Sequence, residues 1–325
     1  MRLGVLDVGS NTVHLLIVDA HPGAPPLPAH SRKTELRLAE HLRADGSLAP
    51  AAIDSLIEVV RASVRDIEDF GATDLLTVVT SALRDASNAA AVLSQVAEAT
   101  GVRLTILSGD DEARLTFLAA RRWYGWSSGR LLVLDIGGGS LELAAGSEEA
   151  PTVAFSLPLG AARLTREYLH HDPPTAEEVR KLRRVVRVAI GDVVGKVTRA
   201  GTPDRVVATS KTFRSLARVG GARPAGDGPR IPRQLRRADL PAIVDTVIGL
   251  SAAQRCDLPG VSPARSRQLA AGALIAQAAL DLLGAAEVDI CPWALREGVI
   301  LRHLDHLVPD WASTPIGATL PTVVG

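Results

Sequence analysis

Two carboxylates and three consecutive glycines follow the apolar run 131–134, which predicts a short buried strand. Because glycine has no Cβ, the backbone N–H groups of this turn can approach an anion closely. A carboxylate beside a bound phosphate is repulsive unless a cation lies between them, and Mg²⁺ prefers one or two carboxylates together with phosphate oxygens. The segment therefore indicates a phosphate and Mg²⁺ site, with an ordinary glycine-rich turn as the alternative. The candidates are Asp135 and Glu142 for the metal, and Gly137, Gly138, Gly139 and Ser140 for the phosphate.

The beginning of the chain repeats this pattern. The apolar run 3–6 leads to Asp7, and a second apolar run covers 13–18. Two such hairpins, one opening each half of the chain, predict a duplicated architecture with a cleft between the halves. Neither copy fits the G-x-G-x-x-G pattern or leads directly into a helix, and the P-loop pattern is absent, so both of these nucleotide-binding folds are disfavoured. The turn of this first hairpin contains Gly9, Ser10, Asn11 and Thr12.

Two further turns place polar residues after a predicted strand. Ser81 and Arg84 follow the strand predicted over 75–79, and a guanidinium can bind phosphate through two hydrogen bonds. A capping serine and a surface arginine are the alternative for this segment. The turn that contains Lys211 follows the strand predicted over 206–208 and is a third candidate phosphate-facing turn.

Glu112 is the sharpest candidate for catalysis. It lies one turn into a helix that follows the strand predicted over 104–107, where open α/β sheets place ligand groups. The neighbouring Asp110 and Asp111 have a simpler explanation, since a helix start favours negative charge.

Composition indicates a globular protein without an overall nucleic-acid-binding character. The 325 residues suggest about two domains, with 46% hydrophobic and 22% charged residues and a formal net charge of zero. Aromatic residues make up 3%, which disfavours recognition of nucleic acid by base stacking. A strand begins near Met1, no apolar run reaches the roughly 20 residues of a membrane span, and the two cysteines are far apart. We therefore expect a cytoplasmic protein with no signal peptide, membrane or nucleic-acid partner.

Long helices are predicted over 175–199, 239–255 and 263–283, and a closing helix over about 296–310. Gly272 interrupts the third of these, which suggests that the helix backbone approaches a neighbouring group closely there. The basic residues between 180 and 187 form either a polyanion-guiding face or, as the simpler explanation, a solvated helix face.

Five segments in this order and spacing resemble the exopolyphosphatase and guanosine pentaphosphate phosphohydrolase family, within the superfamily of actin, the 70-kDa chaperones and sugar kinases. The resemblance covers nearly the whole chain. Two departures are Leu141, where the family usually has Thr, and His14, where it often has Arg. The matching segments are 7–12, 80–88, 108–115, 135–142 and 294–298.

The resemblance implies an α/β protein of two ribonuclease-H-like domains flanking a cleft, over residues 1–125 and 126–295, with the closing helix packing back on the first. It implies that Glu112 is the catalytic base, that Asp135 and Glu142 are metal ligands with Asp7 nearby, and that the glycine turns and Arg84 hold phosphate. Lys211, Arg214 and Arg296 are further candidate contacts to a polyanion. Mg²⁺, with Mn²⁺ as a substitute, is the implied cofactor, and a homodimer is the favoured assembly.

The function that the resemblance implies is hydrolysis of the terminal phosphoanhydride bond of inorganic polyphosphate. Because the chain lacks the extra helical domains of longer members, a preference for short polymers is one expectation. Guanosine pentaphosphate, with guanosine tetraphosphate or other nucleotides, is the alternative substrate, since the chemistry is the same. A sugar or acetate kinase and a nucleotide-dependent assembly module are more distant alternatives.

Overall fold

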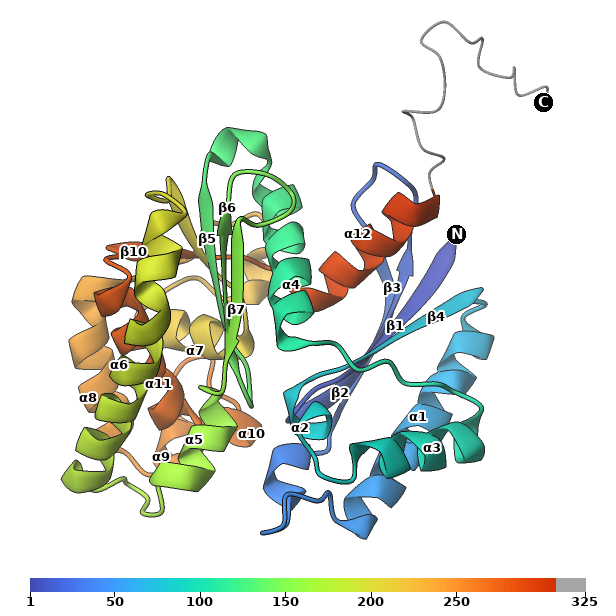
Figure 1. The fold of residues 1–325 in the computed structure, drawn as a ribbon, viewed down its shortest axis with the longest axis horizontal. Helices are drawn as coiled ribbons and strands as arrows, with labels where there is room; N and C mark the ends of the chain where they lie inside the picture. The colour runs from blue at the N-terminus through green and yellow to red at the C-terminus, as the bar shows by residue number, and fades with distance from the viewer. Residues whose placement is uncertain (308–325) are drawn as a thin grey trace, which may run out of the picture.

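The computed structural model describes residues 1–307 and contains two β-sheets, each covered by helices, with two helices between them (Figure 1). The first sheet has the strand order β3-β2-β1-β4, in which β4 alone runs parallel to its neighbour. Its strands are β1 (Arg2–Val8), β2 (Thr12–Asp19), β3 (Leu27–Glu35) and β4 (Asp74–Val79). The accompanying helices are α1 (Pro50–Asp69), α2 (Ser81–Arg84) and α3 (Ala89–Thr100).

The second sheet has the order β7-β6-β5-β8-β10-β9. Its strands are β5 (Leu131–Ile136), β6 (Leu141–Gly146), β7 (Val153–Leu157), β8 (Arg205–Ala208), β9 (Gln234–Arg236) and β10 (Glu287–Ile290). Its helices are α5 (Ala161–Tyr168), α6 (Ala176–Arg199), α7 (Lys211–Val219), α8 (Leu240–Gly249), α9 (Ala252–Arg255), α10 (Pro263–Ser266) and α11 (Leu269–Leu282). Short 3₁₀ helices are η1 (Leu38–His41), η2 (Trp126–Ser128), η3 (Ala225–Asp227) and η4 (Arg237–Asp239).

The two sheets share a plan. In each, three antiparallel strands are followed by strands parallel to the first, β4 in one sheet and β8 and β10 in the other. The duplication predicted from the two hairpins is therefore present in the sheets. The strand predicted over 104–107 is wrong, because only Ile106 bridges to Val79 and the segment forms no ladder.

Helices α4 (Gly109–Tyr124) and α12 (Leu295–Leu307) lie between the two sheets (Figure 1). They cross closely at Gly298, where a Cβ would overlap the backbone of Leu115. Ile300 and Leu304 of α12 join a buried apolar cluster with residues of β1 and β2. The predicted closing helix is confirmed through Leu307, and residues 308–310 of that prediction lie outside the described residues.

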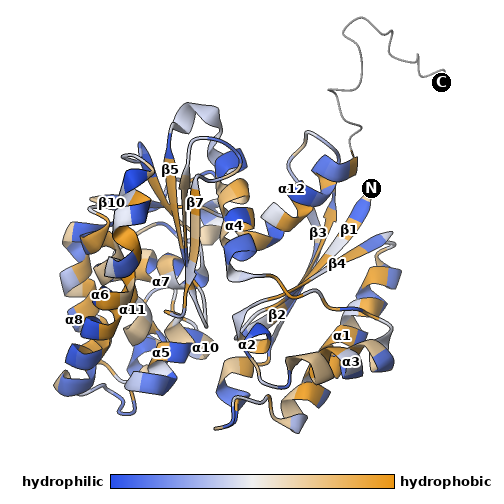
Figure 2. Cartoon of the chain, viewed as in Figure 1, coloured by the Kyte–Doolittle hydropathy of each residue, from blue (hydrophilic) through white to orange (hydrophobic). Residues whose placement is uncertain are grey.

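Apolar residues concentrate on the strands and on the helix faces turned toward them (Figure 2). Helix α11 is buried along most of its length, as its apolar composition on all sides requires. Gly272 lies in this helix where a Cβ would meet the Thr212 methyl group at 2.5 Å, which confirms the close approach predicted there, with a side chain as the neighbour. No helix within residues 1–307 is long and apolar enough to cross a membrane.

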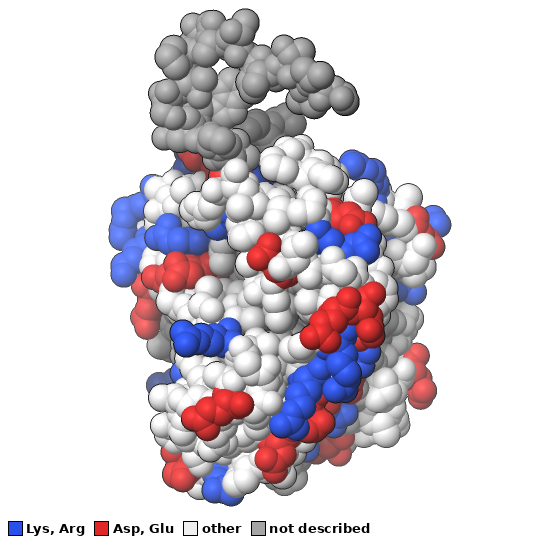
Figure 3. Space-filling model, turned by 90° about the vertical axis from the view of Figure 1, so that its right-hand side faces the viewer, with Lys and Arg blue, Asp and Glu red and all other residues white. Residues whose placement is uncertain are grey.

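Charge on the outer face of the first sheet's helices is mixed. Lys and Arg alternate with Asp and Glu on the face shown in Figure 3, among many uncharged atoms. This face therefore offers a polyanion no continuous positive surface.

Candidate active site

The turns of the two hairpins meet in the cleft between the sheets. Each turn spans four residues and is closed by an equivalent backbone hydrogen bond, from Gly9 N to Thr12 O at 3.0 Å and from Gly137 N to Ser140 O at 2.9 Å. A Cβ on Gly138 would lie 2.7 Å from Ser10 Cβ, so this turn can come so close to the first only because it has no side chain there.

Side chains of the first turn make one contact within their own half of the fold, at Ser10, and one across the cleft, at Asn11. Ser10 Oγ lies 2.9 Å from Ser81 Oγ, and Asn11 Nδ2 donates to Gln268 Oε1 at 3.2 Å. Ser81 begins α2 directly after β4, where its hydroxyl also lies against Gly139. The predicted phosphate-holding residues of separate segments are thus brought into one place.

Glu112 lies in the first turn of α4. The helix begins there because Ser108 caps it, accepting a hydrogen bond from Asp111 N at 3.1 Å. Arg84 Nη1 donates to Glu112 Oε2 at 3.1 Å. Burial raises the pKa of Glu112 to about 8, with the charges of Asp135 and Asp7 adding to the shift and Arg84 opposing it. A carboxyl group with a pKa near neutrality is suited to accept a proton from water.

The two metal-ligand candidates face each other across the second hairpin. Asp135 and Glu142 are directly paired in the β5–β6 ladder. Thr209 donates a hydrogen bond to Asp135, and Ser156 donates one to Glu142 Oε1 at 2.9 Å. Burial raises the pKa of both carboxyls, and for Glu142 the neighbouring Glu112 and Asp135 raise it further.

Asp7 occupies the corresponding place in the first hairpin, and its ladder partner is His14. Arg296 Nη1 donates to Asp7 Oδ2 at 3.1 Å. Burial raises the pKa of Asp7 and lowers that of His14 to about 3, where nearby Arg296 and Lys33 add to the effect. The imidazole therefore stays neutral at neutral pH, and its Nε2 lies 2.7 Å from Ser31 Oγ.

The donor set fits Mg²⁺ with phosphate but offers no ready-made metal cage. Within residues 1–307, no three acidic, histidine or cysteine side chains are gathered as a metal site. Asp135 and Glu142 are nonetheless adjacent carboxylates beside a glycine turn, and each would keep its charge more easily with a cation between them. Mg²⁺ commonly takes only one or two carboxylates and completes its shell with phosphate oxygens and water.

A cavity of about 260 Å³ joins most of the predicted residues. Its walls combine the hairpin turns and acids with a group of basic side chains. Burial lowers the pKa of Lys33, Lys211 and Arg265, and neighbouring cations lower the first two further, so this group would be stabilised by a polyanion. The predicted residues that line it are Asp7, Gly9, Ser10, Asn11, Thr12, Ser81, Glu112, Asp135, Gly137, Gly138, Ser140, Lys211, Arg214 and Arg296.

Three predicted residues do not line this cavity: Arg84, Gly139 and Glu142. Arg84 is held by Glu112 and by the carbonyl of Leu107, so its role as a phosphate contact stays a prediction. Sequence reasoning missed Lys33 and Arg265, which do line the cavity. Lys33 is the ladder partner of His14, so its place depends on a strand pairing that the sequence did not reveal.

Comparison with known proteins identifies the family of this chain. The model of the Ppx/GppA phosphatase family matches residues 16–307. The chain belongs to this family. This chain is 52% identical to exopolyphosphatase 1 of Mycobacterium tuberculosis over 305 residues. The aligned part makes up 94% of this chain and 89% of the relative.

Solved structures of family members share the fold. The Ppx/GppA family member of Aquifex aeolicus has a TM-score of 0.77 at 25% identity, covering 95% of this chain and 99% of its own. An exopolyphosphatase of Cytophaga hutchinsonii has a TM-score of 0.85 at 21% identity, covering 94% and 98%. The protein therefore has the α/β fold of two ribonuclease-H-like halves that the resemblance implied.

Proposed function

We propose that this Ppx/GppA family protein is an exopolyphosphatase, which hydrolyses the terminal phosphoanhydride bond of inorganic polyphosphate and releases phosphate. The observation that carries the proposal is the convergence of Glu112, Asp135 and both hairpin turns around one cavity lined by cations, with Glu142 paired to Asp135 behind its wall. The similarity to a named exopolyphosphatase supports the same activity. The substrate class follows, since a chain of phosphates needs many donors and few specific contacts.

In this mechanism Glu112 orients a water molecule toward the terminal phosphorus and takes its proton. Its raised pKa makes the ionised carboxylate a stronger base than an ordinary glutamate, but the group must first lose its own proton, which a bound cation would favour. Arg84 holds the carboxylate in place through one oxygen, which leaves the second free to face the water. Phosphoryl transfer depends chiefly on positioning and charge neutralisation, so this orientation contributes as much as basicity does.

The backbone N–H groups of Ser10, Asn11 and residues 138–140 would hold the phosphates without adding a net charge, since those of Gly9 and Gly137 already close their own turns. Lys33, Lys211 and Arg265 supply positive charge along the same cavity and would contact the phosphates behind the terminal one. Asp135 and Glu142 would hold Mg²⁺, with Asp7 nearby. When bound, the metal supplies neutralisation of the charge that develops on the phosphate oxygens.

Several finer features stay predictions. They are the use of Mg²⁺ or Mn²⁺, a homodimer, a cytoplasmic location and a preference for short chains. Guanosine pentaphosphate is the alternative substrate, because the same cavity would bind its terminal phosphates. To prefer guanosine pentaphosphate over polyphosphate, the protein would need contacts to the guanine base.

The test is phosphate release by purified protein with Mg²⁺, offered short polyphosphate, long polyphosphate, guanosine pentaphosphate and ATP in parallel. Release from polyphosphate at the highest kcat/KM is expected. Release from the guanosine substrate alone would move the protein to the alternative activity. Tight nucleotide binding without release from any substrate would contradict a hydrolytic function.

A further inference from the structure

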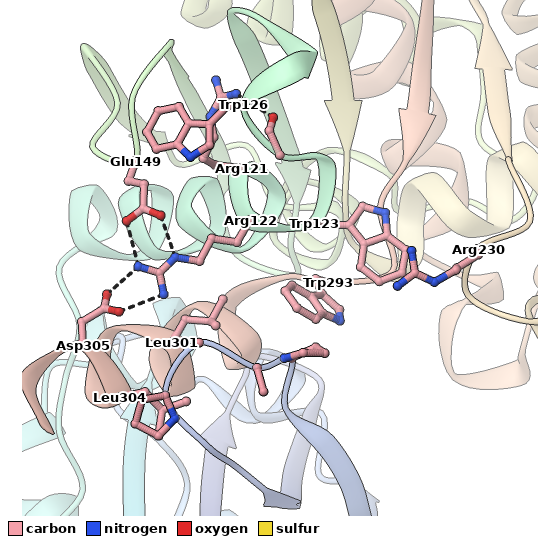
Figure 4. A pocket seen from close by; sticks show the side chains of 15 residues that line it. Arg121, Arg122, Trp123, Trp126, Glu149, Arg230, Trp293, Leu301, Leu304 and Asp305 are labelled. Carbon is pink, nitrogen blue, oxygen red and sulfur yellow. Dashed lines mark hydrogen bonds and ion pairs between the residues drawn. The ribbon is translucent and has the colours of Figure 1, made fainter. Parts of the chain in front are cut away.

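A second and larger cavity, of about 590 Å³, lies away from the candidate active site (Figure 4). Among the described residues, none lines both cavities. Its walls come from both halves of the fold: the connection Pro22–Pro25 and helix α12 on one side, and Glu149, Arg230 and Trp293 on the other. The cavity size falls within the range of small-molecule sites.

Tryptophan dominates this cavity, which we call the tryptophan pocket. All three tryptophans within residues 1–307 line it, although aromatic residues make up only 3% of the sequence. Trp123 and Trp293 meet edge to face with ring centroids 5.3 Å apart. Trp126 leaves 61% of its surface exposed. Arg121 lies over one face of the Trp126 ring, 5.8 Å from its centroid, so a flat ring would stack on the other face.

Three arginines and two acidic side chains line the tryptophan pocket, so its positive charge exceeds its negative charge. Arg122 forms ion pairs at 2.8 Å with both Glu149 and Asp305, so these three side chains satisfy one another (Figure 4). Arg121 is buried and donates to backbone carbonyls, among them Gly129 O at 2.7 Å.

Arg230 is the cation available to a ligand. Its guanidinium lies 5.6 Å from the ring centroid of Trp123, and within residues 1–307 it forms no ion pair. An arginine above an indole places a charged donor beside a stacking surface.

We propose that the tryptophan pocket binds a nucleoside phosphate, with the base stacked on indole and the phosphate at Arg230. A ligand without a ring would leave the indole faces unused, which disfavours inorganic polyphosphate at this position. A purely apolar ligand would leave Arg230 without a partner. A nucleotide satisfies both groups, and its size suits the cavity.

The same two helices connect the tryptophan pocket to the candidate active site. Helix α4 carries Glu112 in its first turn and Arg122 and Trp123 in its last. Helix α12 carries Arg296, which pairs with Asp7, in its first turn, and Asp305 near its end. Both helices cross tightly at Gly298. A nucleotide that draws the two walls together would therefore shift both helices and change the rate of hydrolysis; this second step rests on the proposed function.

Binding is tested by isothermal titration calorimetry with ATP and with GTP, using the Glu112→Gln variant to prevent turnover. Excess tripolyphosphate is present to occupy the catalytic cavity. At least one nucleotide should bind, and Trp126→Ala and Arg230→Ala should each weaken binding by about tenfold, the loss typical of a removed stacking partner. Both side chains are exposed, so the variants should fold.

Val188→Ala and Arg236→Ala are matched controls, since both positions are exposed and line neither cavity. They should leave nucleotide affinity unchanged. Absence of binding at millimolar nucleotide would overturn the proposal. So would binding that tripolyphosphate abolishes, which would place the nucleotide in the catalytic cavity. A change of oligomeric state in Trp126→Ala without nucleotide binding would identify a protein interface instead.

Coupling is tested by phosphate release from polyphosphate with and without the bound nucleotide. The rate should change in the wild type and not in Arg230→Ala, whose basal rate should match the wild type. Because the calorimetry needs no turnover, a protein that binds the nucleotide but hydrolyses no polyphosphate would refute the proposed function and leave the tryptophan pocket proposal intact.

Discussion

The two hairpins have the same backbone plan and different chemistry. Each carries an aspartate near the end of its first strand and a four-residue turn. Opposite Asp7 the returning strand presents His14, whose imidazole is neutral, whereas opposite Asp135 it presents the second carboxylate, Glu142. The first aspartate already faces a cation, Arg296. This comparison makes the second hairpin the better candidate for the proposed metal.

The turns differ in a complementary way. Ser10 and Asn11 of the first turn correspond to Gly138 and Gly139 of the second. The side chains of the first turn occupy the space that the glycines leave free. Ser10 pairs with Ser81 of its own half, and Asn11 pairs with Gln268 of the other half. The first turn thus supplies side-chain hydrogen bonds, and the second turn leaves the space that these side chains occupy.

The strongest test of this asymmetry is removal of the metal. We expect a chelator to abolish phosphate release and added Mg²⁺ to restore it, because buried carboxylates repel phosphate without a cation. The Mg²⁺ concentration for half-maximal rate should rise in Glu142→Gln and stay near the wild-type value in His14→Gln. Full activity in the chelated protein would contradict a metal role for the second hairpin.

Neutralising Asp135 should lower activity nearly as much as removing the metal. We expect Asp135→Asn to lower kcat on the order of 100-fold to 1,000-fold, the range for loss of one strong electrostatic contribution. Asp7→Asn should cost less, since Arg296 already compensates the charge of Asp7. Steady-state kinetics on both variants decide the point, and equal losses would mean that the hairpins share the metal evenly.

A side chain added to the second turn should have an intermediate effect on stability and on KM. In Gly138→Ala the new Cβ would lie 2.7 Å from Ser10 Cβ, so the lobes must separate or the turn must shift. We expect a destabilisation of about 1–3 kcal/mol, as for other overpacked sites, together with a raised KM. Gly9→Ala is the milder comparison, because its Cβ would meet Thr12 O at 3.1 Å, a tight contact but not the overlap expected at Gly138. Thermal unfolding and kinetics measure both, and equal effects would remove the distinction between the turns.

The smallest effect is expected at His14. Because its imidazole is already neutral, His14→Gln removes no charge and should change kcat/KM by less than about threefold, within 1 kcal/mol. His14→Glu would instead give the first hairpin the acidic pair of the second. That variant should lower activity by repelling the substrate, and an unaffected rate would show that His14 lies outside the phosphate path.

Local patterns predicted much of the site. Both hairpins, Glu112 at a helix start and the closing helix follow from short runs of sequence, and the structure brings these residues to one cavity. Long-range pairings were not predictable: Arg296 meets Asp7 and Gln268 meets Asn11 across more than 250 residues of chain. The segment 104–107 has the apolar pattern of a strand but lacks a ladder partner beyond Val79.

The tryptophan pocket illustrates the same limit. Trp123 and Trp126 lie at the end of α4, and Trp293 lies 167 residues after Trp126 in the chain, directly before α12. Nothing in the spacing joins these segments, because only the packing of α4 on α12 brings the ends of both helices together. Sequence reasoning finds sites built on one hairpin or helix turn more readily than sites built where two helices end.

The most direct test of the account is phosphate release from polyphosphate by the wild type, Glu112→Gln and Asp110→Asn. Asp110 is the matched control, an exposed acid in the same helix turn. We predict that Glu112→Gln lowers kcat on the order of 100-fold to 10,000-fold while polyphosphate still binds, and that Asp110→Asn keeps the wild-type rate. A Glu112→Gln protein that retains most of its activity would contradict the assignment of the base and the mechanism built on it.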